Sequence, residues 1–130
     1  MSGRTKLNYN LVMTGWGHVG RGILPETSDI LCTVNEPKVP IRTCQESIRQ
    51  AFNWVELNDL QICTRPLDGS DLACMGDFGG PLIQYDSNNK PEIIGIRTWT
   101  MIACNTNGVP PIYARIPSFV KWINKNINQN

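Results

Sequence analysis

Short apolar stretches separated by turn-forming residues run along most of this chain. Five of them carry the alternation or the β-branched residues typical of strands; they are 11–14, 30–41, 54–63, 82–85 and 93–96. Pro37 and Pro40 indicate that 30–41 is one strand ending at a sheet edge. We expect the apolar residues of 54–63 to lie in the core, and 86–91 to be the loop of a β-hairpin.

Helical spacing of apolar residues occurs at two places. Thr43, with Glu46 three residues on, has the pattern of a helix N-cap. The apolar stripe that follows predicts a helix of about two to three turns; it consists of Cys44, Ile48, Ala51 and Phe52. Ser118 is the predicted N-cap of a second, C-terminal helix. Its apolar residues, which we expect to pack on the strands, are Phe119, Val120, Trp122, Ile123 and Ile127.

The composition is that of a globular protein with a single domain. The 130 residues are 41% hydrophobic and carry a formal charge of +1, so neither nucleic acid nor an acidic membrane surface is an expected partner. No apolar run reaches the length of about eighteen residues that a membrane-spanning helix needs. Residues 1–10, which we expect to be poorly ordered, lack the apolar core of a signal peptide.

Five cysteines lie at wide spacings along the chain; they are Cys32, Cys44, Cys63, Cys74 and Cys104. The chain has no CxxC pair and one histidine, so the pattern argues against zinc, and we expect no metal or cofactor. An odd number of cysteines indicates a bond to another chain or a mate outside this segment.

Three motifs, in this order, resemble the trypsin-like serine proteases. They are Thr14–Gly17 (TGWG), the glycine-rich loop Gly76–Leu82 (GDFGGPL), and Pro111–Pro117 followed by Trp122 and Ile123. The resemblance covers the chain from 11 to 127 and matches the C-terminal one of the family's two β-barrels, so 1–130 is expected to be one partial domain. It implies an all-β fold, a six-stranded antiparallel Greek-key β-barrel with one short helix and a C-terminal helix.

Phe78 stands where the family has its nucleophilic serine. Acyl transfer needs a hydroxyl or thiol that a base can deprotonate, and a phenyl ring offers neither. The resemblance assigns the oxyanion donors to the amides of Gly76 and Phe78, on either side of Asp77. It places the catalytic histidine and aspartate in the first barrel, which has no counterpart here, and His18 is interpreted as a solvated loop residue. We therefore expect a pseudoenzyme of the serine endopeptidase family.

The resemblance also identifies remnants of a substrate pocket. Leu72 takes the place of the residue at the pocket floor, where an aspartate would select basic side chains. Thr98-Trp99-Thr100 matches the family's Ser-Trp-Gly wall, and Pro111 stands where the family usually has glycine. The added bulk of Thr100 and Pro111 predicts a blocked pocket. Asp77, which has no freed terminal ammonium to pair with here, is expected to face solvent or local donors.

The resemblance implies two disulfides, Cys44–Cys63 and Cys74–Cys104, and leaves Cys32 unpaired. In the chain-entropy model, each loop of about 20 to 30 residues closed in this way contributes about 3 to 4 kcal/mol. Leu11 and Gln84 occupy the positions of a further bridge that the family commonly has.

The resemblance predicts a protein that acts by binding, as a decoy, cofactor or regulator of active serine proteases in an extracellular cascade. The expected partner is an active protease, a protease substrate or the missing N-terminal barrel, and not nucleic acid or a membrane. Cysteine usage and the resemblance indicate secretion, although this chain shows no signal peptide. Two alternatives stay open: a serine endopeptidase whose N-terminal barrel is missing here, and a non-functional gene remnant.

Overall fold

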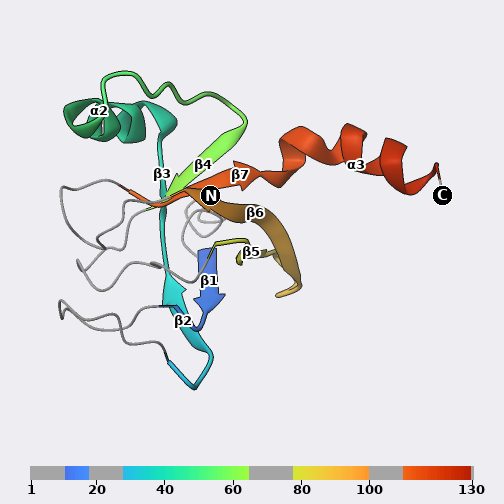
Figure 1. The fold of residues 1–130 in the computed structure, drawn as a ribbon. Helices are drawn as coiled ribbons and strands as arrows, with labels where there is room; N and C mark the ends of the chain where they lie inside the picture. Colours follow the sequence, from blue (N-terminus) through green and yellow to red (C-terminus); the bar gives the residue numbers. More distant parts are fainter. Residues whose placement is uncertain (1–10, 18–27, 65–77, 100–109, 130) are drawn as a thin grey trace.

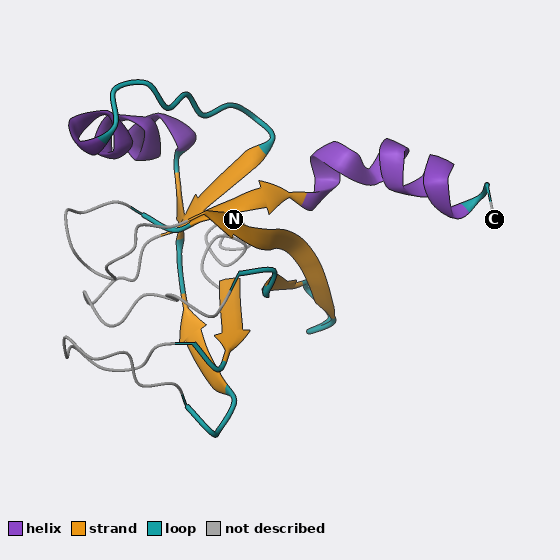
Figure 2. Ribbon diagram, in the orientation of Figure 1, coloured by secondary structure: helices purple, strands orange, loops and turns teal. Residues whose placement is uncertain are grey.

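The computed structural model describes residues 11–17, 28–64, 78–99 and 110–129, and Figure 1 draws their arrangement. Within these ranges short strands dominate, as Figure 2 shows, and two α-helices and one 3-10 helix accompany them. The strands are β1 (Leu11–Gly15), β2 (Cys32–Asn35), β3 (Lys38–Val39), β4 (Gln61–Thr64), β5 (Pro81–Tyr85), β6 (Pro91–Trp99) and β7 (Ile112–Arg115). The helices are α2 (Ile41–Ala51), the 3-10 helix η1 (Ile116–Phe119) and α3 (Val120–Ile127).

All pairings in the sheet are antiparallel, in the order β2-β1-β5-β6-β7-β4-β3. The two end strands, β2 and β3, are separated in the chain only by Glu36 and Pro37. Counted as one bent strand, they join the two ends of this order, and the sheet becomes a six-stranded barrel. The expected all-β Greek-key fold is therefore confirmed for the described residues.

The bend between β2 and β3 corrects the prediction of a single edge strand at 30–41. β2 pairs with β1, β3 pairs with β4, and pairing stops between them, where Pro37 has no N–H to donate. The amide of Glu36 instead donates to the carbonyl of Leu11 at 2.9 Å. The strand ends at Val39, and Ile41 already belongs to α2.

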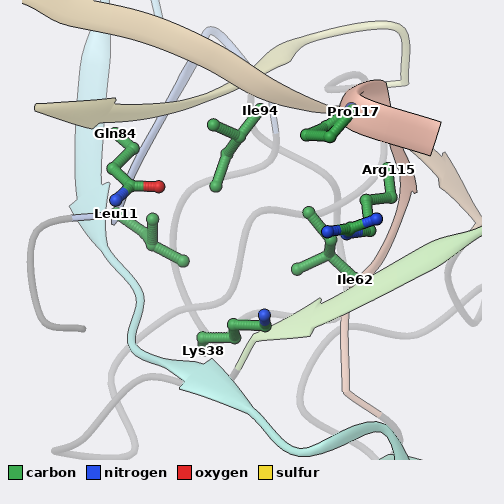
Figure 3. A pocket seen from close by; sticks show the side chains of 7 residues that line it. All are labelled: Leu11, Lys38, Ile62, Gln84, Ile94, Arg115 and Pro117. Atoms are coloured by element: carbon green, nitrogen blue, oxygen red, sulfur yellow. The ribbon is translucent and has the colours of Figure 1, made fainter. Parts of the chain in front are cut away.

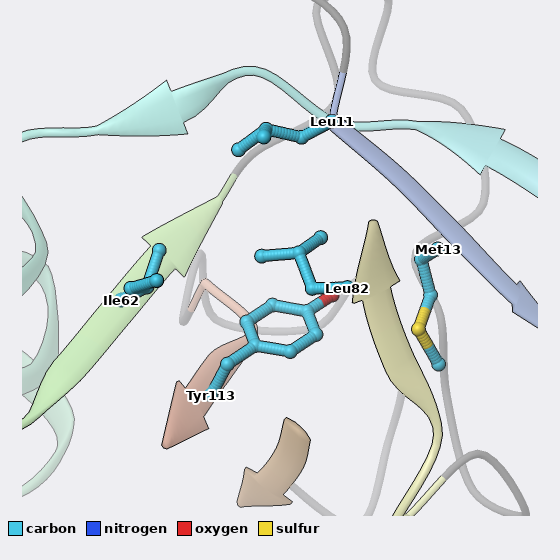
Figure 4. Close-up of a cluster of buried hydrophobic side chains, with 5 residues drawn as sticks. All are labelled: Leu11, Met13, Ile62, Leu82 and Tyr113. Carbon is cyan, nitrogen blue, oxygen red and sulfur yellow. The ribbon is translucent and has the colours of Figure 1, made fainter. Parts of the chain in front are cut away.

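Two clusters of buried side chains form the core. The cluster inside the barrel consists of Leu11, Met13, Ile62, Leu82 and Tyr113 (Figure 4). Gly95 on β6 lies against it, and an added Cβ there would come within 3.1 Å of the Tyr113 Cβ and 3.2 Å of the Leu82 Cβ. The absence of a side chain at Gly95 is therefore what allows β5, β6 and β7 to approach so closely.

The second cluster lies between α2 and the barrel and consists of Cys44, Ile48, Cys63 and Ile112. A disulfide joins Cys44 on α2 to Cys63 on β4, the pair that the resemblance implies. α2 begins at Ile41 after Pro40 and has no side-chain cap, so the predicted N-cap at Thr43 is wrong. The N-cap position is taken by Pro40, whose φ of −54° is fixed by its ring and whose side chain offers no capping acceptor.

The segment between α2 and β4 is held by a side chain rather than by burial. Gln45 donates to the carbonyl of Val55 at 2.7 Å and accepts from the amide of Leu57 at 2.6 Å. Val55 and Leu57 pack partly against the second cluster, but Trp54 is 74% exposed and Leu60 is 40% exposed. The prediction that all apolar residues of 54–63 lie in the core is therefore wrong for these two residues.

The C-terminal helix α3 extends away from the barrel, as Figure 1 shows, and none of its residues is buried. The prediction that it packs on the strands is therefore wrong for the described residues. Ser118 lies inside η1 and is not the N-cap; its hydroxyl donates to the carbonyl of Asp59 at 2.8 Å. None of the helices in the described ranges combines the length and apolar character needed to cross a membrane.

Candidate functional site

The loop at Phe78–Gly80 is fixed to β6 by two backbone hydrogen bonds. The amide of Gly79 donates to the carbonyl of Arg97 at 2.8 Å, and the amide of Arg97 donates to the carbonyl of Gly80 at 2.9 Å. Gly79 has a φ of +79°, a conformation that favours glycine. Phe78 is 53% exposed and belongs to neither of the two core clusters. The position that the resemblance assigns to the family's nucleophile thus carries an exposed ring.

The strands expected to form a pocket wall lie directly beside this loop. Thr98 donates from its hydroxyl to the carbonyl of Ile112 at 3.3 Å, and the backbone of Trp99 pairs with Ile112 after an irregularity in the β6–β7 ladder. Pro111 is fully buried, and its carbonyl accepts from the amide of Thr64 at 3.3 Å. The structure therefore brings Phe78, Thr98, Trp99 and Pro111 onto neighbouring segments at one end of β6.

The other expected site residues lie outside the described residues. They are His18, Leu72, Gly76, Asp77 and Thr100, together with the expected Cys74–Cys104 disulfide. The same holds for the expected disorder of residues 1–10. Cys32 is described and has a free thiol, which donates toward the hydroxyl of Ser28 at 3.4 Å.

A buried polar cluster, which sequence reasoning missed, lies next to these strands. Glu36 Oε2 accepts hydrogen bonds from the hydroxyl of Thr64 at 2.5 Å and from the hydroxyl of Tyr113 at 2.6 Å. Arg97 Nη1 lies 3.4 Å from the same Tyr113 hydroxyl, and the guanidinium carbon lies 5.4 Å from the centre of the tyrosine ring. All four side chains are buried, and Arg97 is only 2% exposed.

The electrostatics of the cluster keep Tyr113 protonated. Burial raises the pKa of Tyr113 well above its ordinary value, and the negative charge of Glu36 raises it further, while the positive charge of Arg97 opposes this. The Tyr113 hydroxyl therefore keeps its proton and donates a hydrogen bond to Glu36 throughout the neutral pH range. The cluster brings one negative and one positive side chain into the barrel and links them through the tyrosine.

Glu36 and Arg97 gave a weak signal in the sequence. Arg97 continues the apolar run Ile93–Ile96, and Glu36 precedes Pro37 where the strand pattern is interrupted. A charged residue within an apolar strand, two residues after a glycine, could have been marked as inward-facing by the alternation of the strand. Its partner, in a segment far away in the chain, could not be identified in this way.

The described residues contain no group of three or more His, Cys, Asp or Glu side chains able to hold a metal ion. The loop at Phe78 supplies backbone amides and an aromatic ring, and the adjacent cluster engages its polar side chains with one another. The Phe78 ring is thus exposed, whereas the cluster is buried.

The closed antiparallel barrel, with its terminal helix and its fixed glycine-rich loop, is the architecture of a serine protease half-domain. A family model described as Trypsin matches residues 3–123, and the chain belongs to the trypsin family. It is 30% identical over 125 residues to kallikrein 1-related peptidase b5 of Mus musculus, covering 96% of this chain and 44% of that protein.

Two other relatives are similarly close. Trypsin-1 of Astacus astacus is 32% identical over 117 residues, which cover 90% of this chain and 46% of that protein. Protein masquerade of Drosophila melanogaster is 34% identical over 122 residues, which cover 91% of this chain and 11% of that protein. The chain thus spans less than half the length of these curated relatives.

Proposed function

We propose that this chain is a non-catalytic member of the trypsin family that acts by binding another protein. The observation that carries the proposal is Phe78, which stands at the position of the family's nucleophile in a loop whose remaining sequence follows the family pattern. A phenyl ring can neither attack a carbonyl nor be activated by a base. Two backbone hydrogen bonds to Arg97 on β6 hold the end of this loop in place.

The buried polar cluster supports the same proposal. Arg97 immediately precedes Thr98 and Trp99, which match the wall of the family's substrate pocket, and its guanidinium is turned inward against Tyr113. Pro111, which replaces the usual glycine, is also buried, and its carbonyl accepts from the amide of Thr64. Side chains of this chain therefore take up space next to the wall, which disfavours binding of a substrate side chain.

The terminal helix α3 is the proposed contact surface for a protein partner. Val120, Trp122 and Ile127 are 45%, 66% and 65% exposed on a helix of eight residues. A projecting amphipathic helix whose apolar side chains lie in solvent is typical of a protein–protein contact. The proposed partners are an active protease, a protease substrate or the N-terminal barrel of the family, in an extracellular cascade.

Labelling with a fluorophosphonate tests the absence of catalysis. The chain is incubated with the reagent beside an active trypsin, and adducts are mapped by mass spectrometry. We expect labelling of the trypsin and none of this chain, and we expect the same for Phe78→Ser, because a serine alone has no base to activate it. A serine adduct on the wild-type chain, or peptide hydrolysis by either protein, would overturn the proposal.

Binding is tested separately with the chain immobilised and active trypsin in solution. We expect Trp122→Ser to weaken binding by more than about tenfold, as truncation of a central tryptophan typically does. The matched control is Lys90→Ser, in the β5–β6 hairpin, which should leave the affinity unchanged. Equal binding of both variants would exclude α3 as the contact surface without bearing on catalysis.

A further inference from the structure

The barrel contains a cavity of about 330 Å³ whose lining is apolar on its walls and cationic at two points. Its apolar walls come from three strands, β1, β4 and β6, and from the 3-10 helix η1, and consist of Leu11, Ile62, Ile94 and Pro117. Its polar groups are the side chains of Lys38, Gln84 and Arg115, which Figure 3 shows around the same space. Cavities of about 300 to 1,000 Å³ with mostly apolar walls and a few polar groups are the usual form of small-molecule sites.

The two cations of this cavity have no acidic partner in the described part of the chain. Lys38 makes no ion pair there, and Arg115 uses Nη1 to donate to the hydroxyl of Ser118 at 3.0 Å. Ser118 is itself tied to the carbonyl of Asp59 at 2.8 Å, so the guanidinium is held in place. Glu92 lies opposite Gln84 in the β5–β6 ladder, but its exposed side chain does not line the cavity. The lining itself is therefore positively charged.

We propose that this cavity binds an organic anion with an apolar body, namely a medium-chain carboxylate. Its hydrocarbon chain packs against Leu11, Ile62 and Ile94, which removes apolar surface from water. Its carboxylate pairs with Lys38 and with the free N–H groups of Arg115, whose planar fork matches a carboxylate. The proposal is independent of catalysis, because none of these residues belongs to the loop at Phe78 or to the buried polar cluster.

Charge complementarity distinguishes this ligand from other apolar molecules. A neutral alcohol of the same length would contact the same apolar walls but would form no ion pair with Lys38 or Arg115. An alkylammonium would bring a third positive charge beside Lys38 and Arg115 and would be repelled. A series of three probes that differ only in their headgroup therefore separates binding in this cavity from general attraction to exposed apolar side chains.

The experiment is a titration of the 130-residue chain with octanoate, 1-octanol and octylammonium, followed by calorimetry. We expect octanoate to bind with one site per chain and more tightly than octanol, and octylammonium to bind most weakly. Lys38→Met should lower the affinity for octanoate by about threefold to fivefold, which is the effect of one partly exposed ion pair. It should leave the affinity for octanol unchanged. The matched control is Lys121→Met on α3, which should change neither affinity.

The location is tested with a methyl NMR experiment on the wild-type protein, which does not depend on a variant that folds. We expect nuclear Overhauser contacts between the octanoate chain and the methyl groups of Ile62 and Ile94. The proposal is overturned by equal affinity for the three probes, by contacts confined to α3, or by no binding of octanoate at millimolar concentration. It is also overturned if Lys38→Met and Lys121→Met behave alike.

Discussion

Replacing Tyr113 by phenylalanine removes one oxygen from the buried polar cluster and leaves the ring in place. The lost hydroxyl donates to Glu36 Oε2 at 2.6 Å, and the other carboxylate oxygen, Oε1, has no hydrogen-bond partner among the described residues. Glu36 would then rely on the hydroxyl of Thr64 alone. A hydrogen bond to a buried charged group contributes about 1.5 to 3 kcal/mol, so we expect Tyr113→Phe to lower the free energy of unfolding by about 2 kcal/mol.

The assay is urea unfolding followed by circular dichroism, with the disulfide kept oxidised. With a denaturant slope of about 2 kcal/mol per molar urea, the expected loss lowers the midpoint by about 1 M. The matched control is Tyr85→Phe on β5, whose hydroxyl makes no hydrogen bond within the described residues, and we expect a change below about 0.5 kcal/mol there. Equal stability of the two variants would refute the importance of the cluster.

The same variant should also differ from the wild type in how the free energy of unfolding depends on pH, and the direction of the difference follows from the raised pKa of Tyr113. Below the ordinary pKa of 10.0 the tyrosine is protonated in both the folded and the unfolded chain, so its contribution is fully present. Above it, the unfolded tyrosine loses its proton first, and the folded state loses stability as the pH rises, by at most about 1.4 kcal/mol per pH unit. We expect Tyr113→Phe to lack this part of the decline seen in the wild type between pH 9 and about 11. Superimposable profiles of the two proteins would contradict the raised pKa.

Three further outcomes follow from the fold. Cys44→Ala with Cys63→Ala, which opens a link between residues 19 apart, should lower the free energy of unfolding by about 3 kcal/mol, and reductant should destabilise this double variant less than it destabilises the wild type; a variant as stable as the oxidised wild type would be contrary to this. Gly95→Ala should cost about 1 to 3 kcal/mol, since its Cβ would lie 3.1 Å from the Tyr113 Cβ; a neutral effect in urea unfolding would mean that β7 shifts freely. Trp122→Ser should change stability by less than about 0.5 kcal/mol, because the tryptophan is 66% exposed, and a larger loss would reveal packing of α3 on the barrel.

The local elements of this chain could be predicted from the sequence where turn residues and hydrophobic pattern agree. Pro81, the loop 86–91 and the apolar run after it define the β5–β6 hairpin, which the structure contains. The stripe through Cys44 and Ile48 identified α2 and the face that it buries. In these segments each residue is placed mainly by its own neighbours in the chain.

The errors arose where placement depends on distant segments. Trp54 has the same apolar character as Val55, but only the latter is packed against the second cluster, because the side chain of Gln45 fixes that part of the loop. The stripe of α3 predicts an apolar face without saying what covers it.

The buried polar cluster shows the same limit at the candidate site. Glu36 and Tyr113 are 77 residues apart in the chain, and alternation within a strand cannot show that a carboxylate and a phenol meet inside the barrel. Phe78, by contrast, could be singled out as a candidate from the sequence, because its signal is one substitution inside a short and specific motif. A substitution at one position can be recognised from the sequence, whereas contacts between residues on opposite sides of the barrel can be identified only once the fold is known.

The bend at Glu36 and Pro37 also limits how this protein can associate with others. Because each half of the bent strand pairs on one side, the unpaired backbone edges there are confined to the four residues of β2 and the two of β3. Edges this short, interrupted by a proline, are poor templates for the addition of a foreign strand. At this edge, contact with a partner is therefore expected to come from side chains, and it can change through surface substitutions while the barrel stays the same.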